Sequence, residues 1–292
     1  MRLFILGLRR SGTTVFWESF RPDRRFACYD EPFNPILNEL PAPEPKGTRD
    51  EWIALFRRNP ERFWRLFSPI AGVEELQESL SDRQREYLEY VVASSENCVM
   101  DMTRCHFKLE ALREVVPDAF VVHLYRAAAP WVSSHLGARG SGWRGRMRSA
   151  IDRLSFFERS HRYGYWGIEQ IIADSPETLF GQRAAENHLD PAAVYEMPAI
   201  GRMLAYWKVL YDRIERDGPR VFGRRFCSVA FSDFCVDPIG TVRRIYDFIG
   251  VKAPALELKG VHGPRPAYRE KDLRWKLYGR KIGIAEDSGL LF

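Results

Sequence analysis

The chain has 292 residues, of which 45% are hydrophobic and 28% are charged, which is the composition of an ordinary globular protein. Its net charge of +5 is mild and spread along the sequence, which argues against a nucleic-acid partner. The five cysteines are odd in number and form no C-x-x-C pair, so we expect reduced thiols in a cytoplasmic protein instead of a disulfide framework or a zinc site. No stretch approaches the roughly 18 consecutive apolar residues that span a bilayer.

The first segment with chemical meaning is RLFILGLRRSGTTVFWE, at residues 2–18. Its opening apolar run predicts a buried strand, the Gly, Ser and Thr residues predict a turn, and the apolar residues after them predict a helix. In such a unit the backbone N–H groups and the positive end of the helix dipole point at one spot, which forms an anion site. The two glycines have phosphate-loop spacing, but Thr13 stands where a nucleotide triphosphatase has lysine, and Arg10 supplies the cation instead.

A second short strand is predicted over residues 25–29, followed by the irregular segment DEPFNP. This places Glu31 just beyond a strand end, where open α/β sheets hold their ligands. After a proline-rich connection at residues 40–46, apolar residues at three- and four-residue spacing predict helices over residues 48–93. We interpret this block as a helical insertion that also borders a binding pocket.

Further strands are predicted over residues 97–101 and 119–125, with a helix over 106–116 between them, which is a right-handed crossover in a parallel sheet. The remaining predicted elements, in chain order, are a glycine-rich loop at 137–146, helices at 151–160 and about 191–216, a last strand at 226–231, and a helix capped by Asp237 and ended by Gly250. The fold class is therefore α/β: a P-loop-like, three-layer fold with a central, mainly parallel sheet flanked by helices. We expect a single domain over residues 1–292, with the insertion at about 45–95 and a C-terminal tail at about 252–292.

The R-S-G-T-T turn resembles the phosphosulfate-binding loop of the sulfotransferases that use 3′-phosphoadenosine-5′-phosphosulfate (PAPS). Two distant segments strengthen this resemblance. Arg126 at a strand end and Ser134 eight residues later match the motif that holds the 3′-phosphate, although Ala127 and Ala128 stand where an acidic residue and proline are common. The segment FSDFCVDPIGTVRRIYDFIGV is similar to the family's Y-E-D-L…P…I…F-L-G segment, with Phe231 at the tyrosine position.

The resemblance implies transfer of a sulfuryl group from PAPS to a hydroxyl, or less readily an amine, of a small-molecule, glycan or lipid acceptor. The nucleotide product would be adenosine 3′,5′-bisphosphate (PAP), and no metal is expected. The residues that the resemblance assigns to the cofactor are Arg9, Arg10, Ser11, Gly12, Thr13 and Thr14 at the phosphosulfate, Arg126 and Ser134 at the 3′-phosphate, and Phe231 at the adenine. Arg10 and the loop Ser11–Thr14 are also expected to stabilise the leaving 5′-phosphate.

Glu31 is the first candidate for the general base, because its E-P segment resembles the position of the catalytic carboxylate in carbohydrate and protein-tyrosine sulfotransferases. His106 is the rival, since soluble small-molecule sulfotransferases use a histidine near the end of the third strand. The equivalent position here is Arg104, which could contact the transferring sulfuryl group or pair with Glu31.

Two other functions stay open at the level of sequence. One is a P-loop small-molecule kinase with Asp101 on Mg²⁺, against which Thr13 argues. The other is a non-catalytic nucleotide-binding protein. A homo-oligomer is also left open.

Overall fold

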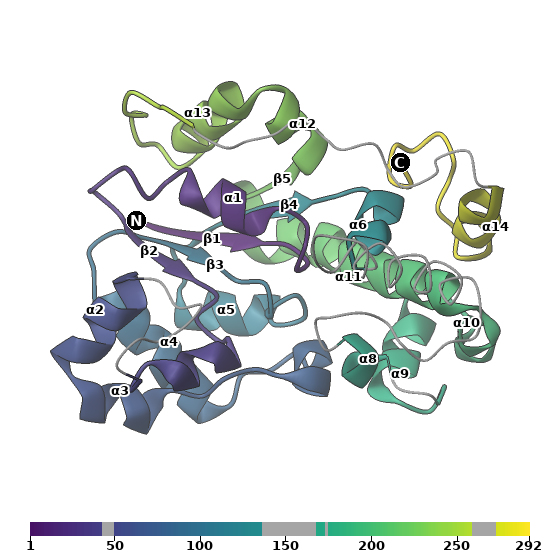
Figure 1. The fold of residues 1–292 in the computed structure, drawn as a ribbon, viewed down its shortest axis with the longest axis horizontal. Helices are drawn as coiled ribbons and strands as arrows, with labels where there is room; N and C mark the ends of the chain where they lie inside the picture. Colours follow the sequence, from purple (N-terminus) through teal and green to yellow (C-terminus); the bar gives the residue numbers. More distant parts are fainter. Residues whose placement is uncertain (43–49, 136–167, 173–174, 259–272) are drawn as a thin grey trace, which may run out of the picture. The chain divides into compact units, whose positions relative to one another are not determined.

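The computed structural model describes residues 1–42, 50–135, 168–172, 175–258 and 273–292 (Figure 1). The chain divides into two compact units: the first comprises Met1–Tyr125 and Arg213–Gly263, and the second comprises Arg126–Asp212 and Pro264–Phe292. The single-domain organisation expected from the sequence stays a prediction.

The first unit is built on a five-stranded sheet in the order β2-β3-β1-β4-β5, and every neighbouring pair is parallel. The strands are β1 (Arg2–Leu6), β2 (Ala27–Asp30), β3 (Cys98–Asp101), β4 (Phe120–Tyr125) and β5 (Phe226–Ala230). This confirms the predicted parallel α/β sheet. The second strand begins at Ala27 and not at residue 25, because a turn precedes it in which the Phe26 N–H donates to the Asp23 carbonyl at 3.0 Å.

Helices cover both faces of the sheet because side chains alternate along each strand. Phe4 and Leu6 of β1 lie in one apolar cluster, and Leu3 and Ile5 lie in the other. The first cluster is covered by α2 (Asp50–Arg58), α3 (Pro60–Leu66), α4 (Asp82–Ala93) and α5 (Leu109–Val115). The second is covered by α1 (Thr13–Glu18), α12 (Phe231–Val236) and α13 (Pro238–Phe248). The three-layer prediction is confirmed for this unit.

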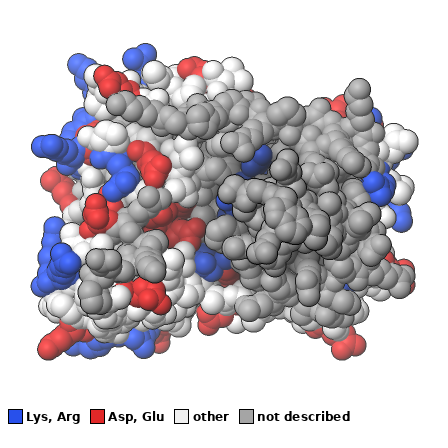
Figure 2. All heavy atoms as spheres, in the orientation of Figure 1, with Lys and Arg blue, Asp and Glu red and all other residues white. Residues whose placement is uncertain are grey.

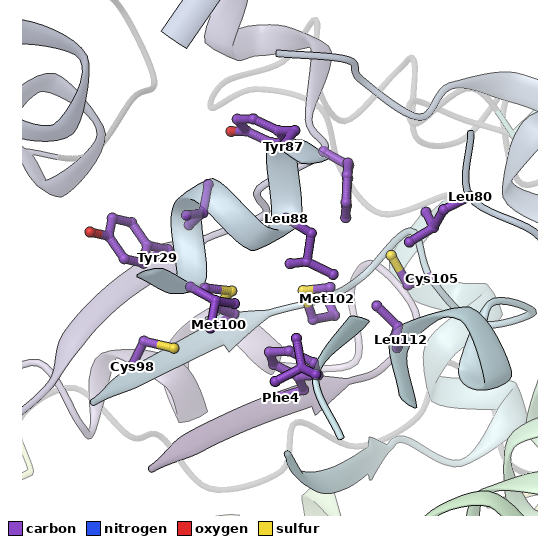
Figure 3. Packing of buried hydrophobic residues seen from close by; sticks show 14 of the residues in the cluster. Phe4, Tyr29, Leu80, Tyr87, Leu88, Cys98, Met100, Met102, Cys105 and Leu112 are labelled. Atoms are coloured by element: carbon purple, nitrogen blue, oxygen red, sulfur yellow. The ribbon is translucent and has the colours of Figure 1, made fainter. Parts of the chain in front are cut away.

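The helices predicted over residues 48–93 are present from Asp50 onward as α2, α3 and α4. The 3₁₀ turn η2 (Gly72–Leu76) lies between α3 and α4, and another 3₁₀ turn, η1 (Pro35–Glu39), precedes the block. Figure 3 shows Leu88 of α4 pointing toward Met102, which lies just after β3. This helical block therefore buries its apolar side chains against the sheet, as its spacing predicts.

The second unit is helical. Its elements are α6 (Ala128–His135), α8 (Ile168–Ile171), α9 (Leu179–Glu186), α10 (Pro191–Glu196), the first half of α11 (Ala199–Phe222) and α14 (Leu273–Lys281). The helix predicted over residues 191–216 is wrong as a single element. Pro198 holds Met197 in an extended conformation with ψ of 153°, which separates α10 from α11.

Past residue 216, α11 continues to Phe222, in the first unit, where the 3₁₀ turn η3 (Gly223–Arg225) leads into β5.

Both predicted ends of α13 are confirmed. The Asp237 side chain accepts from the Gly240 N–H at its start, and Gly250 adopts a φ of 70° just beyond its end. The predicted loop at 137–146 and helix at 151–160 lie outside the described residues.

Charged side chains of both signs are interspersed over the described part of the face seen in Figure 2. This mixed surface agrees with the small net charge of +5. Within the described ranges, no helix has both the length and the apolar character needed to cross a membrane.

Candidate active site

The turn after β1 has an unusual backbone. Arg10 and Gly12 both have left-handed conformations, with φ of 73° and 95°, and the Ser11 N–H donates to the Leu8 carbonyl at 2.9 Å. Gly12 is the N-cap of α1, so the first N–H groups of that helix have no partner within it. The strand, glycine turn and helix predicted from the sequence are therefore confirmed as local structure.

Both glycines of the turn lie where a side chain has no room. A Cβ on Gly7 would lie 2.5 Å from the Leu124 carbonyl oxygen and 2.5 Å from the methyl group of Thr13. A Cβ on Gly12 would lie 2.1 Å from the ring of Phe231, the first residue of α12. The structure thus brings Phe231 against the turn. Its contact with adenine stays a prediction.

The hydroxyl of Ser11 is buried and can donate a hydrogen bond. The residue is 1% exposed, and its Oγ has no hydrogen-bond partner among the described residues. A buried polar atom without a partner costs free energy, about 1–3 kcal/mol in mutational data. An anion with acceptor oxygens, held by the turn beside the exposed Arg10, would satisfy this hydroxyl.

Glu31 follows β2 directly and is strained. Its φ is 44°, and the non-glycine residues with a positive φ in the described chain are Arg10, Glu31 and His188. Such strain costs on the order of 1–3 kcal/mol per residue and gathers at functional sites. Two of these three positions are site residues predicted from the sequence, and both follow a strand at its carboxyl end.

The Glu31 carboxylate accepts from the Asn34 side chain, and the Arg104 Nε lies 3.9 Å from its Oε2. The pairing of Arg104 with Glu31, one of two roles predicted for this arginine, is therefore present. A contact with a sulfuryl group stays a prediction.

Glu75, on η2, contacts two of the candidate site residues, and the sequence did not reveal it. It is 1% exposed and accepts from both guanidinium nitrogens of Arg9, at 2.8 and 2.9 Å, and from Arg104 at 2.7 Å. Burial raises the pKa of Glu75, while the two guanidiniums act in the opposite direction. The Arg9 guanidinium, predicted to bind cofactor, is thus engaged by Glu75. No local pattern distinguishes Glu75 from the exposed Glu74 beside it.

His106 lies beneath the turn and not at its surface. Its Nε2 is 3.1 Å from the Gly7 carbonyl, which can only accept, so we assign the ring proton to Nε2. Burial lowers the pKa of His106 to about 3, since the hydrogen bond to Gly7 only partly offsets it. The ring is therefore neutral at pH 7, and its placement favours support of the turn over proton transfer.

Asp101 ends β3 and is fully buried. Neither carboxyl oxygen has a hydrogen-bond partner among the described residues. Burial raises the pKa of Asp101 well above its usual range, with the charges of Glu31 and Asp30 acting in the same direction. The Thr13 hydroxyl opposes this shift without reaching hydrogen-bond geometry. Across the described ranges, no group of three or more His, Cys, Asp or Glu side chains is placed to hold a metal ion.

Arg126 and Ser134 belong to the second unit. The Arg126 carbonyl accepts from the Trp207 indole N–H at 2.9 Å. The Ser134 hydroxyl donates to the Trp131 carbonyl at 2.7 Å within α6, so it would have to turn before donating to a phosphate. The assignment of both residues to the 3′-phosphate stays a prediction.

The family model described as the sulfotransferase family matches residues 2–173 and 178–255 of this chain. A parallel α/β fold occurs in proteins of many functions, whereas the match to a family model is specific. The chain belongs to the sulfotransferase family, which indicates a transferase.

Solved structures similar to the chain include a sulfotransferase from Alicyclobacillus acidocaldarius, with 13% identity, a TM-score of 0.44, and coverage of 96% of this chain and 91% of that one. The sulfotransferase domain of the Synechococcus PCC 7002 olefin synthase has 14% identity, a TM-score of 0.45, and coverage of 99% and 90%. A sulfotransferase from Mycobacterium avium has 17% identity, a TM-score of 0.43, and coverage of 87% and 64%. A comparison with curated proteins gave no match.

Proposed function

We propose that this protein transfers the sulfuryl group of PAPS to a hydroxyl of a small-molecule, glycan or lipid acceptor. Membership of the sulfotransferase family supports the reaction class. The observation that supports the choice of donor is the turn after β1. There a strained Arg10 and a buried Ser11 hydroxyl, which has no hydrogen-bond partner in the described part of the chain, adjoin a helix N-terminus.

These residues fit the phosphosulfate end of PAPS because they are donors and a cation, and the cofactor has acceptor oxygens. When bound, PAPS supplies a sulfuryl group attached to a phosphate leaving group. In the proposal Arg10, the Ser11 hydroxyl and the backbone N–H groups of residues 12–14 hold that phosphate. Donors fixed before the reaction stabilise the charge that grows on a leaving oxygen.

Glu31 accepts the proton of the incoming hydroxyl in this proposal. Its carboxylate lies at the carboxyl edge of the parallel sheet, the same edge as the turn, which is where open α/β sheets bind their ligands. His106 is less suited, since its Nε2–H is used by the Gly7 carbonyl and a base with a pKa of about 3 is weak at neutral pH. Arg126 and Ser134 are proposed at the 3′-phosphate, and Phe231 at the adenine, from the sequence motifs.

Thermal unfolding with two nucleotides tests the proposal. We expect PAP to raise the melting temperature in the absence of magnesium, and ATP with magnesium to leave it unchanged. Stabilisation by ATP with magnesium alone would instead favour the kinase suggested by the loop spacing. If PAP stabilises the protein but PAPS is never consumed with any acceptor in a broad screen, the protein binds the nucleotide without catalysing transfer.

A further inference from the structure

Glu75 has no role in the chemistry proposed above, yet it is buried and contacts both Arg9 and Arg104. Its side chain is 1% exposed, and both of its oxygens accept from Arg9 in a two-pronged pair. Since guanidinium is always charged and both carboxylate oxygens accept, Glu75 is held as an anion.

The backbone that carries Glu75 is fixed from both sides. The ammonium of Lys108, itself 1% exposed, donates to the Glu74 carbonyl at 2.7 Å and to the Gln77 carbonyl at 2.6 Å. The Glu74 side chain in turn accepts from the Ala71 N–H at 3.3 Å. The position of η2, and with it the Glu75 carboxylate, is therefore set before any ligand binds.

Arg104 is shared between two carboxylates at unequal distances. Its guanidinium lies 2.7 Å from Glu75 and 3.9 Å from Glu31. A carboxylate in close contact with a guanidinium is stabilised in its charged form and is a weaker base. The hydrogen-bonded contact is therefore made to Glu75, and the ion pair with Glu31 is the longer of the two.

We infer that Glu75 is a positioning residue that holds Arg104 back from Glu31 and so keeps Glu31 able to accept a proton. This inference rests on the proposed role of Glu31 as the general base. Without the Glu75 anion, Glu31 is the carboxylate that still pairs with Arg104 among the described residues, and the Arg104 side chain is only 12% exposed.

Other charged groups surround Glu31 besides Glu75. Asp30 on β2 and Asp101 on β3 carry carboxyl groups. A carboxyl group that is charged disfavours ionisation of a second carboxyl group beside it. The cations are Arg104, after β3, and Arg9, which reaches this group through Glu75. Neutralising Glu75 removes the anion that Arg104 contacts at 2.7 Å, so the positive charge of Arg104 then acts more strongly on Glu31.

Carbon-13 NMR of the full-length protein with labelled glutamate side chains tests this inference without an acceptor. The Glu31 signal is assigned by its loss in Glu31→Gln and is titrated with pH in wild type and Glu75→Gln. We expect the titration midpoint of Glu31 to fall by about 1 pH unit in Glu75→Gln, the size of shift that an uncompensated nearby cation produces. An unchanged midpoint in folded Glu75→Gln overturns the inference.

Asp217→Asn is the matched control, because Asp217 is also a buried carboxylate held by arginines, with Arg213 at 2.6 Å and Arg216 at 3.3 Å. It should lower the melting temperature without moving the Glu31 midpoint; a shift as large as that of Glu75→Gln would overturn the inference. If Glu75→Gln does not fold, Glu75→Asp replaces it. Its carboxylate is one methylene too short to reach both guanidiniums, so the midpoint should fall by a smaller amount, and no fall overturns the inference.

The same experiment separates this inference from the proposed function. The midpoint of Glu31 is measured whether or not the protein transfers sulfate, whereas the proposed function fails if wild type shows no stabilisation by PAP. If an acceptor is found, the acidic limb of the kcat/KM profile should move to lower pH in Glu75→Gln by the same amount as the NMR midpoint. If the NMR midpoint moves but the acidic limb of the kcat/KM profile does not, Glu31 is not the general base. The contact between Glu75 and Arg104 would be unaffected by that result.

Discussion

Substitution of Gly12 by alanine is the sharpest test of how the loop is built. Gly12 has a φ of 95°, and an added Cβ would lie 2.1, 2.4 and 2.7 Å from three ring carbons of Phe231. A left-handed backbone costs alanine about 1–2 kcal/mol. Forcing a methyl group into packed atoms costs about 1–3 kcal/mol more, so we expect Gly12→Ala to lower the free energy of unfolding by about 2–5 kcal/mol.

A double-mutant cycle in urea unfolding separates the two contributions. In a Phe231→Ala background the clash is gone, so Gly12→Ala should cost only the backbone part, about 1–2 kcal/mol. Gly250→Ala is the matched control, because Gly250 also has a left-handed φ, of 70°, and nothing lies within 4 Å of its would-be Cβ. Its cost should be the same in both backgrounds. An equal cost of Gly12→Ala with and without Phe231 would refute the packing of this ring on the turn.

Three further substitutions test the proposed site. Glu31→Gln should leave PAP affinity near wild type while turnover falls roughly a hundredfold or more, and full activity would move the base role elsewhere. Arg126→Ala should weaken PAP binding in calorimetry by about 2 kcal/mol or more, unlike Arg183→Ala on α9; unchanged affinity would remove the 3′-phosphate motif. Folding lowers the pKa of His106 from its ordinary value of about 6.5 to about 3. As the pH falls between these two values, the unfolded chain binds a proton at His106 that the folded protein does not bind, so the free energy of unfolding decreases. His106→Asn should make the free energy of unfolding less dependent on pH between 7 and 5, and an equal slope in both proteins would contradict the buried neutral ring.

Much of the first unit was predictable from the sequence because its signals are local. The apolar run of β1, the two glycines after it and the apolar residues of α1 are neighbours in the chain, so composition and spacing alone indicate a strand, a turn and a helix. The position of Glu31 was predictable in the same way, since it follows a predicted strand directly, and its role as a base stays a prediction. The break between α10 and α11 had a local signal too, in Pro198, which the apolar spacing on either side concealed.

The charged network beneath the site depends on contacts between distant parts of the chain. Glu75 is 66 residues from Arg9 and 29 from Arg104, and nothing in the residues around it distinguishes a buried anion from a solvated one. Likewise the sequence could place Asp101 at the end of a strand but not decide its protonation, which depends on the burial imposed by the surrounding elements. The sequence by itself thus determined the layered fold and the residues that could bear chemistry. Only the tertiary structure decided which charges face one another in the absence of water, because burial and long-range pairing are properties of the packed chain.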